Sequence, residues 1–398
     1  MPQNSTRYLM RFAPFWVPLA YVVILATLLA PFIASSFVVE DDTFYLPRAI
    51  LGEPLIPDTL QANFYAIAGL GRFGSFELYK VVLLTLFALN SALLAVFLAR
   101  VWGYPLLASL VAMVVMGMPV AVDQYIFFTG AHPTFAMTFI LLALHVFQRA
   151  YALQRLRFVV GMMAVSVLLW VATQVSPTET LALFLLPLWL FIARLTVPKK
   201  PTKALFWASA IGALCVALAV AVLTAASLQY NDLGWVNVSA LQILQNFVVA
   251  LVKLVFTFGN RQSPLFLLFW AGISLIFALC VWQSVRARNS RPMLSVAGYA
   301  LATSALTFGP SSILITFASA DRYLVLPVVF GMLALIALGM SIAPIWEKRP
   351  QVYLIAILAL LVGINLAGAH RNMNNKYAHI KHTHDLILAF SQQERGWL

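Results

Sequence analysis

Three consecutive carboxylates, Glu40, Asp41 and Asp42, follow closely on the first long apolar stretch of this chain. Like charges this close repel one another, and partial desolvation at a membrane edge raises the cost. A solvated loop would accommodate the triplet without any chemistry. Alternatively, adjacent carboxylates divide the work, so that one stays ionised while another acts as a general base or holds a cation. The triplet is therefore a candidate catalytic group.

The residues that follow the triplet add aromatic and cationic side chains. Phe44 and Tyr45 suit either a sugar ring or the membrane interface, where aromatic anchors are common. Arg48 comes soon after them, and Arg72 lies where the chain returns toward the bilayer. We assign Tyr45, Arg48 and Arg72 as candidate contacts to an acceptor or a sugar.

A second charged group, Asp321-Arg322-Tyr323, stands at the start of a late apolar stretch. An arginine at this depth is costly unless it meets an anion, which is either Asp321 or a phosphate. The planar donor fork of a guanidinium suits a phosphate well, so Arg322 and Tyr323 are candidate phosphate contacts. Solvation or snorkelling would also explain the weaker candidates for this role. These are His132, Lys253 and Arg261.

The histidines near the C-terminus have a spacing that invites a metal interpretation. His379, His382 and His384 form an HxxHxH pattern. The group lacks the cysteines of stronger metal motifs, and Lys381 lies between the ligands. We therefore expect a short amphipathic helix here, and no metal ion or other cofactor.

The composition is that of an integral membrane protein built from helices. Of the 398 residues, 62% are hydrophobic and only 10% are charged, whereas a soluble protein carries about 25% charged residues. The mean hydropathy is +0.91. The net charge of +12 does not indicate a nucleic-acid partner, because the basic residues are spread in small groups between apolar stretches.

The apolar stretches predict about eleven transmembrane helices. Their expected ranges are 15–37, 78–99, 105–122, 133–148, 158–174, 180–196, 204–228, 264–284, 293–309, 323–345 and 351–369. A further stretch, 240–258, contains Lys253 and ends at Gly259-Asn260-Arg261, so we expect a re-entrant or interfacial helix there.

The loops predict a cytoplasmic N-terminus and an extracytoplasmic C-terminus. In this orientation 15 of the 25 Lys and Arg residues face the cytoplasm beside a single acid, Glu347, in accord with the positive-inside rule. The first outer loop is then 38–77. A polytopic domain, 1–369, precedes an extracytoplasmic tail, 370–398. The short loops favour a bacterial inner membrane.

The order of these features resembles the polytopic GT-C-type glycosyltransferases. The resemblance rests on an N-terminal span followed at once by Asp41-Asp42-Thr43-Phe44-Tyr45, then Arg48 and Gly52-Glu53-Pro54-Leu55. The late segment Arg322-Tyr323-Leu324-Val325-Leu326-Pro327 is also similar to one in that family. The resemblance implies that a sugar passes from a polyprenyl-phosphate donor to a glycan or lipid acceptor on the outer face of the membrane.

The same resemblance implies roles for individual residues. An acid of the first outer loop would act as base on the acceptor hydroxyl, which corresponds to Asp41 or Asp42, with Asp41 favoured. Arg322 would balance the donor phosphate, and no metal would be required. Two departures from the family are the lack of a soluble C-terminal domain and the presence of Glu40 before the acid pair, which leaves open which acid acts.

Two other functions fit parts of the sequence. A transporter or flippase of a lipid-linked or polyanionic substrate would need charges deep within several spans and paired broken helices near the midplane. The predicted spans are almost free of such charge. A glycan polymerase or ligase acting on diphosphate lipids is a further alternative, although such enzymes usually depend on larger outer loops.

Overall fold

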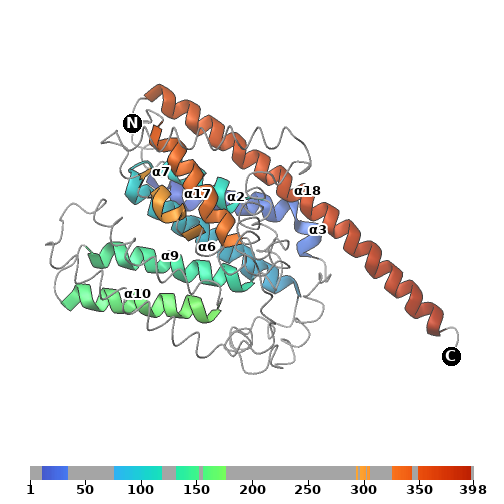
Figure 1. Cartoon of the computed structure of the whole chain (residues 1–398). Coiled ribbons are helices and arrows are strands. Elements are labelled where there is room, and N and C mark those ends of the chain that lie inside the picture. The colour runs from blue at the N-terminus through green and yellow to red at the C-terminus, as the bar shows by residue number, and fades with distance from the viewer. Residues whose placement is uncertain are drawn as a thin grey trace, which may run out of the picture.

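The computed structural model describes several separate parts of the chain, and the regular elements within them are all helices (Figure 1). The described residues are 11–34, 76–118, 131–151, 156–175, 293–304 without 295 and 302, 325–342, and 348–395. The predicted all-helical fold is confirmed for this part of the chain.

The described helices coincide with many of the predicted apolar stretches. They are α2 (Ala13–Leu28), α3 (Ala30–Ile33), α6 (Phe76–Trp102), α7 (Pro105–Met116), α9 (Ala131–Tyr151), α10 (Leu156–Val175), α17 (Val325–Ile342) and α18 (Lys348–Arg395). Residues within 293–304 are helical as well. The predicted spans 180–196, 204–228 and 264–284 and the stretch 240–258 lie outside the described residues.

Two of these helices are long and apolar enough to cross a membrane, judged by length and composition. Lys80–Trp102 within α6 has 23 residues and a mean hydropathy of 2.5, and Gln351–Asn375 within α18 has 25 residues and a mean hydropathy of 2.4. The α18 segment is mostly exposed and carries large apolar side chains on its surface, such as Tyr353 and Leu360. An exposed apolar helix of this length favours a membrane protein.

Proline and glycine set the local breaks between helices. The first predicted span, 15–37, is divided at Leu29, because Pro31 lacks an N–H and is tolerated in the first turn of a new helix, α3. Between α6 and α7, Gly103 adopts a φ of +79°, which costs glycine little, and Pro105 then starts α7. These residues produce a tight α6–α7 hairpin.

Contacts between side chains fix the relative directions of the helices. Asn90 of α6 binds Thr134 near the start of α9, and Arg100 at the end of α6 binds His145 further along α9, so α6 and α9 are parallel. Lys80 at the start of α6 contacts Phe32 at the end of α3, so α2–α3 and α6 are antiparallel. These are the directions that α2–α3, α6, α7 and α9 would have if each crossed a membrane in turn.

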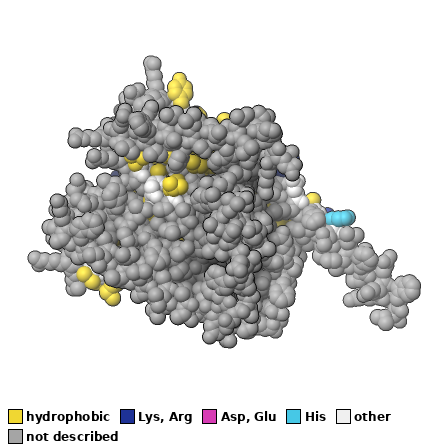
Figure 2. Space-filling model, viewed as in Figure 1, with side chains coloured by type: hydrophobic (Ala, Val, Ile, Leu, Met, Phe, Trp, Pro, Cys, Tyr) yellow, Lys and Arg dark blue, Asp and Glu magenta, His cyan; other side chains and the backbone are white. Residues whose placement is uncertain are grey.

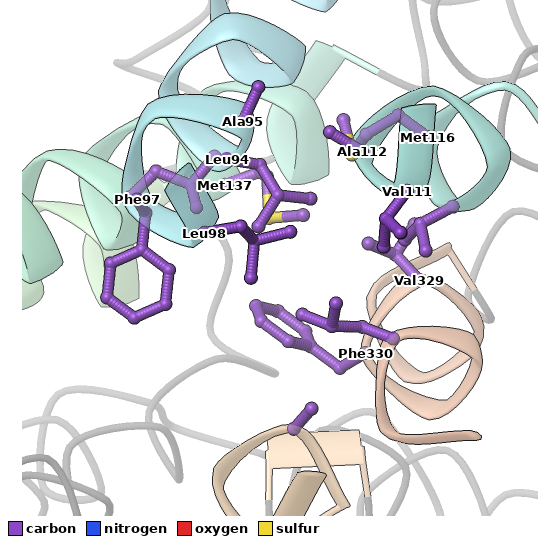
Figure 3. Packing of buried hydrophobic residues seen from close by; sticks show 14 of the residues in the cluster. Leu94, Ala95, Phe97, Leu98, Val111, Ala112, Met116, Met137, Val329 and Phe330 are labelled. Carbon is purple, nitrogen blue, oxygen red and sulfur yellow. The ribbon is translucent and has the colours of Figure 1, made fainter. Parts of the chain in front are cut away.

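The interior of the bundle is apolar and is built from segments far apart in the sequence. Figure 3 shows Leu98 of α6 pointing toward Phe330 of α17, with Val111 of α7 beside Val329. These side chains are almost completely buried. Their packing holds the described N-terminal helices and α17 in one body.

Small residues let α9 and α10 approach closely. A Cβ added at Gly161 of α10 would clash with the side chain of Ala150 on α9. Such small-residue contacts are typical of helix packing within membranes, where close approach of backbones replaces the hydrophobic driving force. Replacement of Gly161 by a larger residue would therefore separate this hairpin.

The last helix, α18, continues well past its membrane-compatible segment. It has 48 residues and is about 72 Å long at 1.5 Å per residue. Its C-terminal part projects away from the bundle in Figure 1. The described side chains visible in Figure 2 are mostly hydrophobic. The predicted boundary at 369 therefore lies inside a continuous helix, and residues 370–395 extend that helix.

Candidate membrane-edge site

Nearly all of the candidate site residues lie outside the described residues. These are Glu40, Asp41, Asp42, Tyr45, Arg48, Arg72, Lys253, Arg261, Arg322 and Tyr323. His132 lies in the first turn of α9, where its backbone but not its side chain is described. The structure therefore places helices beside the first outer loop and after Arg322, whereas the stretches around Lys253 and Arg261 lie outside the described residues.

The helix ends that flank the first charged group lie close together, and the start of α17 lies deeper in the bundle. α3 ends at Ile33, seven residues before Glu40, and α6 begins at Phe76, within the last residues of the first outer loop, 38–77. α17 ends at Ile342 and α18 begins at Lys348, so a short connection keeps these two ends close. Because α18 runs parallel to α2, α17 runs the opposite way, and its start, three residues after Arg322, points toward the end where α3 stops (Figure 1). That start nevertheless lies deeper in the bundle than the end of α3, because Phe330 packs near Leu98, about 27 Å along α6 from Lys80.

The direction of α18 follows from its side-chain contacts. Asn365 binds the carbonyl of Val114 on α7, and Tyr377, further along α18, packs edge to face on Phe32 at the end of α3, with ring centroids 6.4 Å apart. α7 runs parallel to α2, since each is antiparallel to α6, and Tyr21 contacts Gly117 at the end of α7. The beginnings of α2, α7 and α18 thus lie at one end of the bundle and the end of α3 at the other.

A buried lysine lies where the first outer loop leaves and rejoins the helices. Lys80 is fully buried, and its Nζ donates to the Phe32 carbonyl at 2.9 Å. The same ammonium group lies 4.3 Å from the centre of the Phe32 ring, within the range of a cation–π interaction. With Tyr377 on Phe32, this contact joins α3, α6 and α18.

Deeper in the bundle, side chains satisfy the carbonyl end of α7. The last carbonyls of a helix have no partner within the helix, and a buried one is costly unless it is bonded. Asn365 Nδ2 donates to the Val114 carbonyl at 2.8 Å, and the Tyr21 hydroxyl donates to the Gly117 carbonyl at 3.2 Å. A Cβ at residue 117 would lie 2.5 Å from the Tyr21 oxygen, so glycine is required there.

A second buried polar group joins α6 to the start of α9. Asn90 Nδ2 donates to the Thr134 carbonyl at 3.0 Å, and the Thr138 hydroxyl donates to Asn90 Oδ1 at 2.8 Å. Asn90 lies ten residues beyond Lys80, about 15 Å along α6. His132, two residues before Thr134 in the first turn of α9, is therefore well removed along the bundle from the contact of Lys80 with Phe32.

The opposite end of α6 and α9 carries exposed arginines. Arg100 Nη1 donates to His145 Nδ1 at 3.0 Å, and His145 Nε2 lies 2.9 Å from the Leu93 carbonyl. Because a carbonyl only accepts, the neutral ring carries its proton on Nε2 and accepts from Arg100 at Nδ1. Arg100 and Arg149 are both exposed. This is the end that the loop charges predict to be cytoplasmic.

The described residues contain no group of three or more His, Cys, Asp or Glu side chains able to hold a metal ion. On the projecting part of α18, His382 is exposed, and the side chains of His379 and His384 are not described. His370 Nε2 lies 3.0 Å from Asn374 Nδ2 one turn further along.

Sequence analysis did not identify two polar residues that the structure places in the interior, Lys80 and Asn90. Lys80 lies near the point where the chain returns toward the bilayer, and Asn90 lies within the apolar stretch 78–99. The available signal was a polar residue with mostly apolar neighbours, which is rare in membrane helices and usually has a defined partner. No family model, curated protein or solved structure matches the chain.

Proposed function

We propose that this protein is a polytopic, GT-C-like membrane glycosyltransferase. It transfers a sugar from a polyprenyl-phosphate donor to a glycan or lipid acceptor on the extracytoplasmic face, in a bacterial inner membrane. The observation that carries the proposal is the Glu40-Asp41-Asp42 triplet directly after the first apolar helix, together with Arg322 just before α17. The contact of Lys80 with Phe32 supports it, because it brings together the helix ends that flank the loop carrying the triplet.

The chemistry requires a base and a cation. Asp41, or Asp42 beside it, takes the proton of the acceptor hydroxyl as its oxygen attacks the anomeric carbon of the donor sugar. The bond between that carbon and the phosphate oxygen breaks, and the polyprenyl phosphate leaves with the bonding electrons. Arg322 balances the charge that grows on the leaving phosphate. Tyr45, Arg48 and Arg72 contact the sugar or the acceptor, and Tyr323, His132, Lys253 and Arg261 are secondary candidates near the donor phosphate.

The proposed topology has about eleven crossings, with a cytoplasmic N-terminus and an extracytoplasmic C-terminus. It places twelve of the 13 acids at the outer side or its membrane edge, and most loop arginines and lysines inside. A lipid-linked donor is confined to the bilayer, so an active site at the outer membrane edge gives it direct access. The parallel packing of α6 with α9 supports the order of crossings.

A comparison of surface glycans tests the proposed function. Glycans are analysed by mass spectrometry from cells with the wild-type gene, from a deletion strain, and from deletion strains complemented with Asp41→Asn or Asp42→Asn. We expect a fixed sugar mass to disappear in the deletion and in at least one of the two mutants at normal protein level. Arg149→Gln, a substitution at the opposite end of the bundle, is the matched control and should restore the glycan.

Each other outcome has a definite meaning. Full restoration by both aspartate mutants would remove the catalytic assignment and favour transport of the lipid-linked substrate. Counter-flow of such a substrate in proteoliposomes, without covalent change, would then support the transporter alternative. An unchanged glycan profile in the deletion strain would overturn the glycosyltransferase proposal itself.

A further inference from the structure

Lys80 occupies an unusual position for a cation. It is fully buried at the first residue of a membrane-compatible helix segment, although its long side chain could reach water from a less enclosed site. Burial of a charge is costly unless specific partners compensate for it. A methionine or leucine would fill similar space without that cost, so the ammonium group must contribute something that an apolar side chain cannot.

The partners of Lys80 show what that contribution is. Nζ binds a carbonyl among the last residues of α3, where backbone acceptors lack partners within the helix and where the helix dipole favours a cation. The Phe32 ring adds a second contact with the same ammonium group. One side chain of α6 thus holds both the backbone and the ring of a residue in α3.

Phe32 and Lys80 lie on the two helices that flank the first outer loop, close to its two ends. Phe32 lies six residues before residue 38, and Lys80 lies three residues after residue 77. The loop of about 40 residues between them carries Glu40, Asp41 and Asp42. Joining these two residues shortens the distance that the loop must close and restricts where its first residues can go.

We propose that the Lys80–Phe32 contact acts as a clamp on the first outer loop and that Lys80 is a positioning residue for the loop carboxylates. This inference rests on the proposed function for its catalytic consequence, but the clamp itself does not depend on that function. Tyr377 strengthens the clamp from α18, because its ring packs on the other partner, Phe32. Lys80 acts on the loop through Phe32, whose carbonyl and ring it contacts near the end of α3.

Cysteine labelling measures the clamp without any substrate. In a background with Cys215 and Cys280 replaced by alanine, Ser36→Cys reports access near the start of the loop, and its rate of maleimide labelling is followed on purified protein in detergent. We expect Lys80→Met to raise that rate about tenfold, the change produced by loss of one charge-assisted hydrogen bond from a local opening equilibrium. Lys80→Arg retains a cation and a donor and should stay within about threefold of the parent.

Sugar transfer is measured in parallel on the same substitutions in the native cysteine background. We expect Lys80→Met to lose most of the glycan modification and Lys80→Arg to restore it. Leu84→Ala, a buried apolar substitution one turn further along α6, is the control for general destabilisation. It should lower the melting temperature without raising the labelling of Ser36→Cys below the melting transition.

The outcomes separate the clamp from the function. Unchanged labelling in Lys80→Met would overturn the clamp, and raised labelling with normal sugar transfer would overturn the positioning role. Raised labelling in a protein whose wild type transfers no sugar would uphold the clamp while the proposed function fails. If Lys80→Met does not fold, Phe32→Leu removes the ring and keeps the carbonyl, and labelling equal to that of the parent would count against the clamp.

Discussion

The two ends of α6 hold their cations in opposite ways. At the start of the helix, Lys80 is buried and binds the carbonyl and the ring of Phe32. At the other end, Arg100 is exposed and donates to His145, which in turn contacts a backbone carbonyl of α6. Both cations link α6 to another helix, but only Lys80 does so with no access to solvent.

This difference assigns different work to the two ends. Exposed polar contacts contribute little to stability, because water competes for them and salt screens them. Buried contacts contribute more, because removal of one partner leaves the other desolvated and unbonded. The exposed arginines are therefore suited to fix orientation in a membrane, whereas the buried lysine is suited to fix a particular local structure beside the acid-bearing loop.

The largest expected effect comes from replacing Arg322 and Arg149, which the proposed topology puts on opposite sides of the membrane, by alanine. Arg322→Ala should lower the rate of sugar transfer by about 10²–10³-fold, the usual cost of losing one group that stabilises developing charge. Arg149→Ala should leave the rate within about twofold, as for surface substitutions remote from a site. Initial rates of glycan modification in membrane vesicles, normalised to protein level, give the comparison. Equal losses at both ends would show that the two arginines share a role in assembly.

A smaller effect is expected where α18 satisfies the end of α7. Asn365→Leu should lower the free energy of unfolding by about 1–3 kcal/mol, because the Val114 carbonyl is left buried without that donor. Asn374→Leu is the matched control, since Asn374 is exposed and its side chain contacts His370, one turn earlier in the same helix. Titration of the purified protein with SDS, followed by helical circular dichroism, measures both. A loss from Asn374→Leu as large as that from Asn365→Leu would contradict the capping role of Asn365.

A third effect tests the polar contact midway between the two ends. Thr138→Val removes the hydrogen bond to Asn90 and should cost about 1 kcal/mol, near the upper range for polar contacts between membrane helices. The control is Thr85→Val, because the Thr85 hydroxyl binds only the Val81 carbonyl of its own helix. The same SDS titration applies. If the two valine variants unfold together, the α6–α9 hydrogen bond contributes nothing measurable.

The sequence predicted the helices better than their ends. Apolar stretches located α6, α9 and α10 to within a few residues, because length and hydropathy are local properties. The predicted span 105–122 extended past the end of α7 at Met116. Gly117 followed by Pro119 is a common signal for the end of a helix, and the apolar residues around it concealed that signal. Pro31 likewise divided the first span into two helices.

The candidate site was predicted by residue type, and its geometry was not predictable. The carboxylates of the first outer loop and Arg322 stand out because charges are rare in this chain. The contact of Lys80 with Phe32 joins residues 48 positions apart, and the contact of Asn365 with Val114 joins residues 251 positions apart. No local pattern encodes such pairs, since they arise from how whole helices pack.

The smallest expected effect concerns the two ends of α6, where the cation at each end is replaced by glutamine. Arg100→Gln should change the free energy of unfolding by less than about 0.5 kcal/mol, because Arg100 is exposed, glutamine can still donate to the half-buried His145, and water replaces what is lost. Lys80→Gln should cost clearly more, about 1–3 kcal/mol, since the shorter neutral side chain leaves the enclosed Phe32 carbonyl without its charged donor. SDS titration of both variants at low and high salt separates the cases, because only an exposed contact is strongly screened. Similar losses for the two variants would show that burial does not distinguish the ends, and the special role of Lys80 would then have no energetic basis.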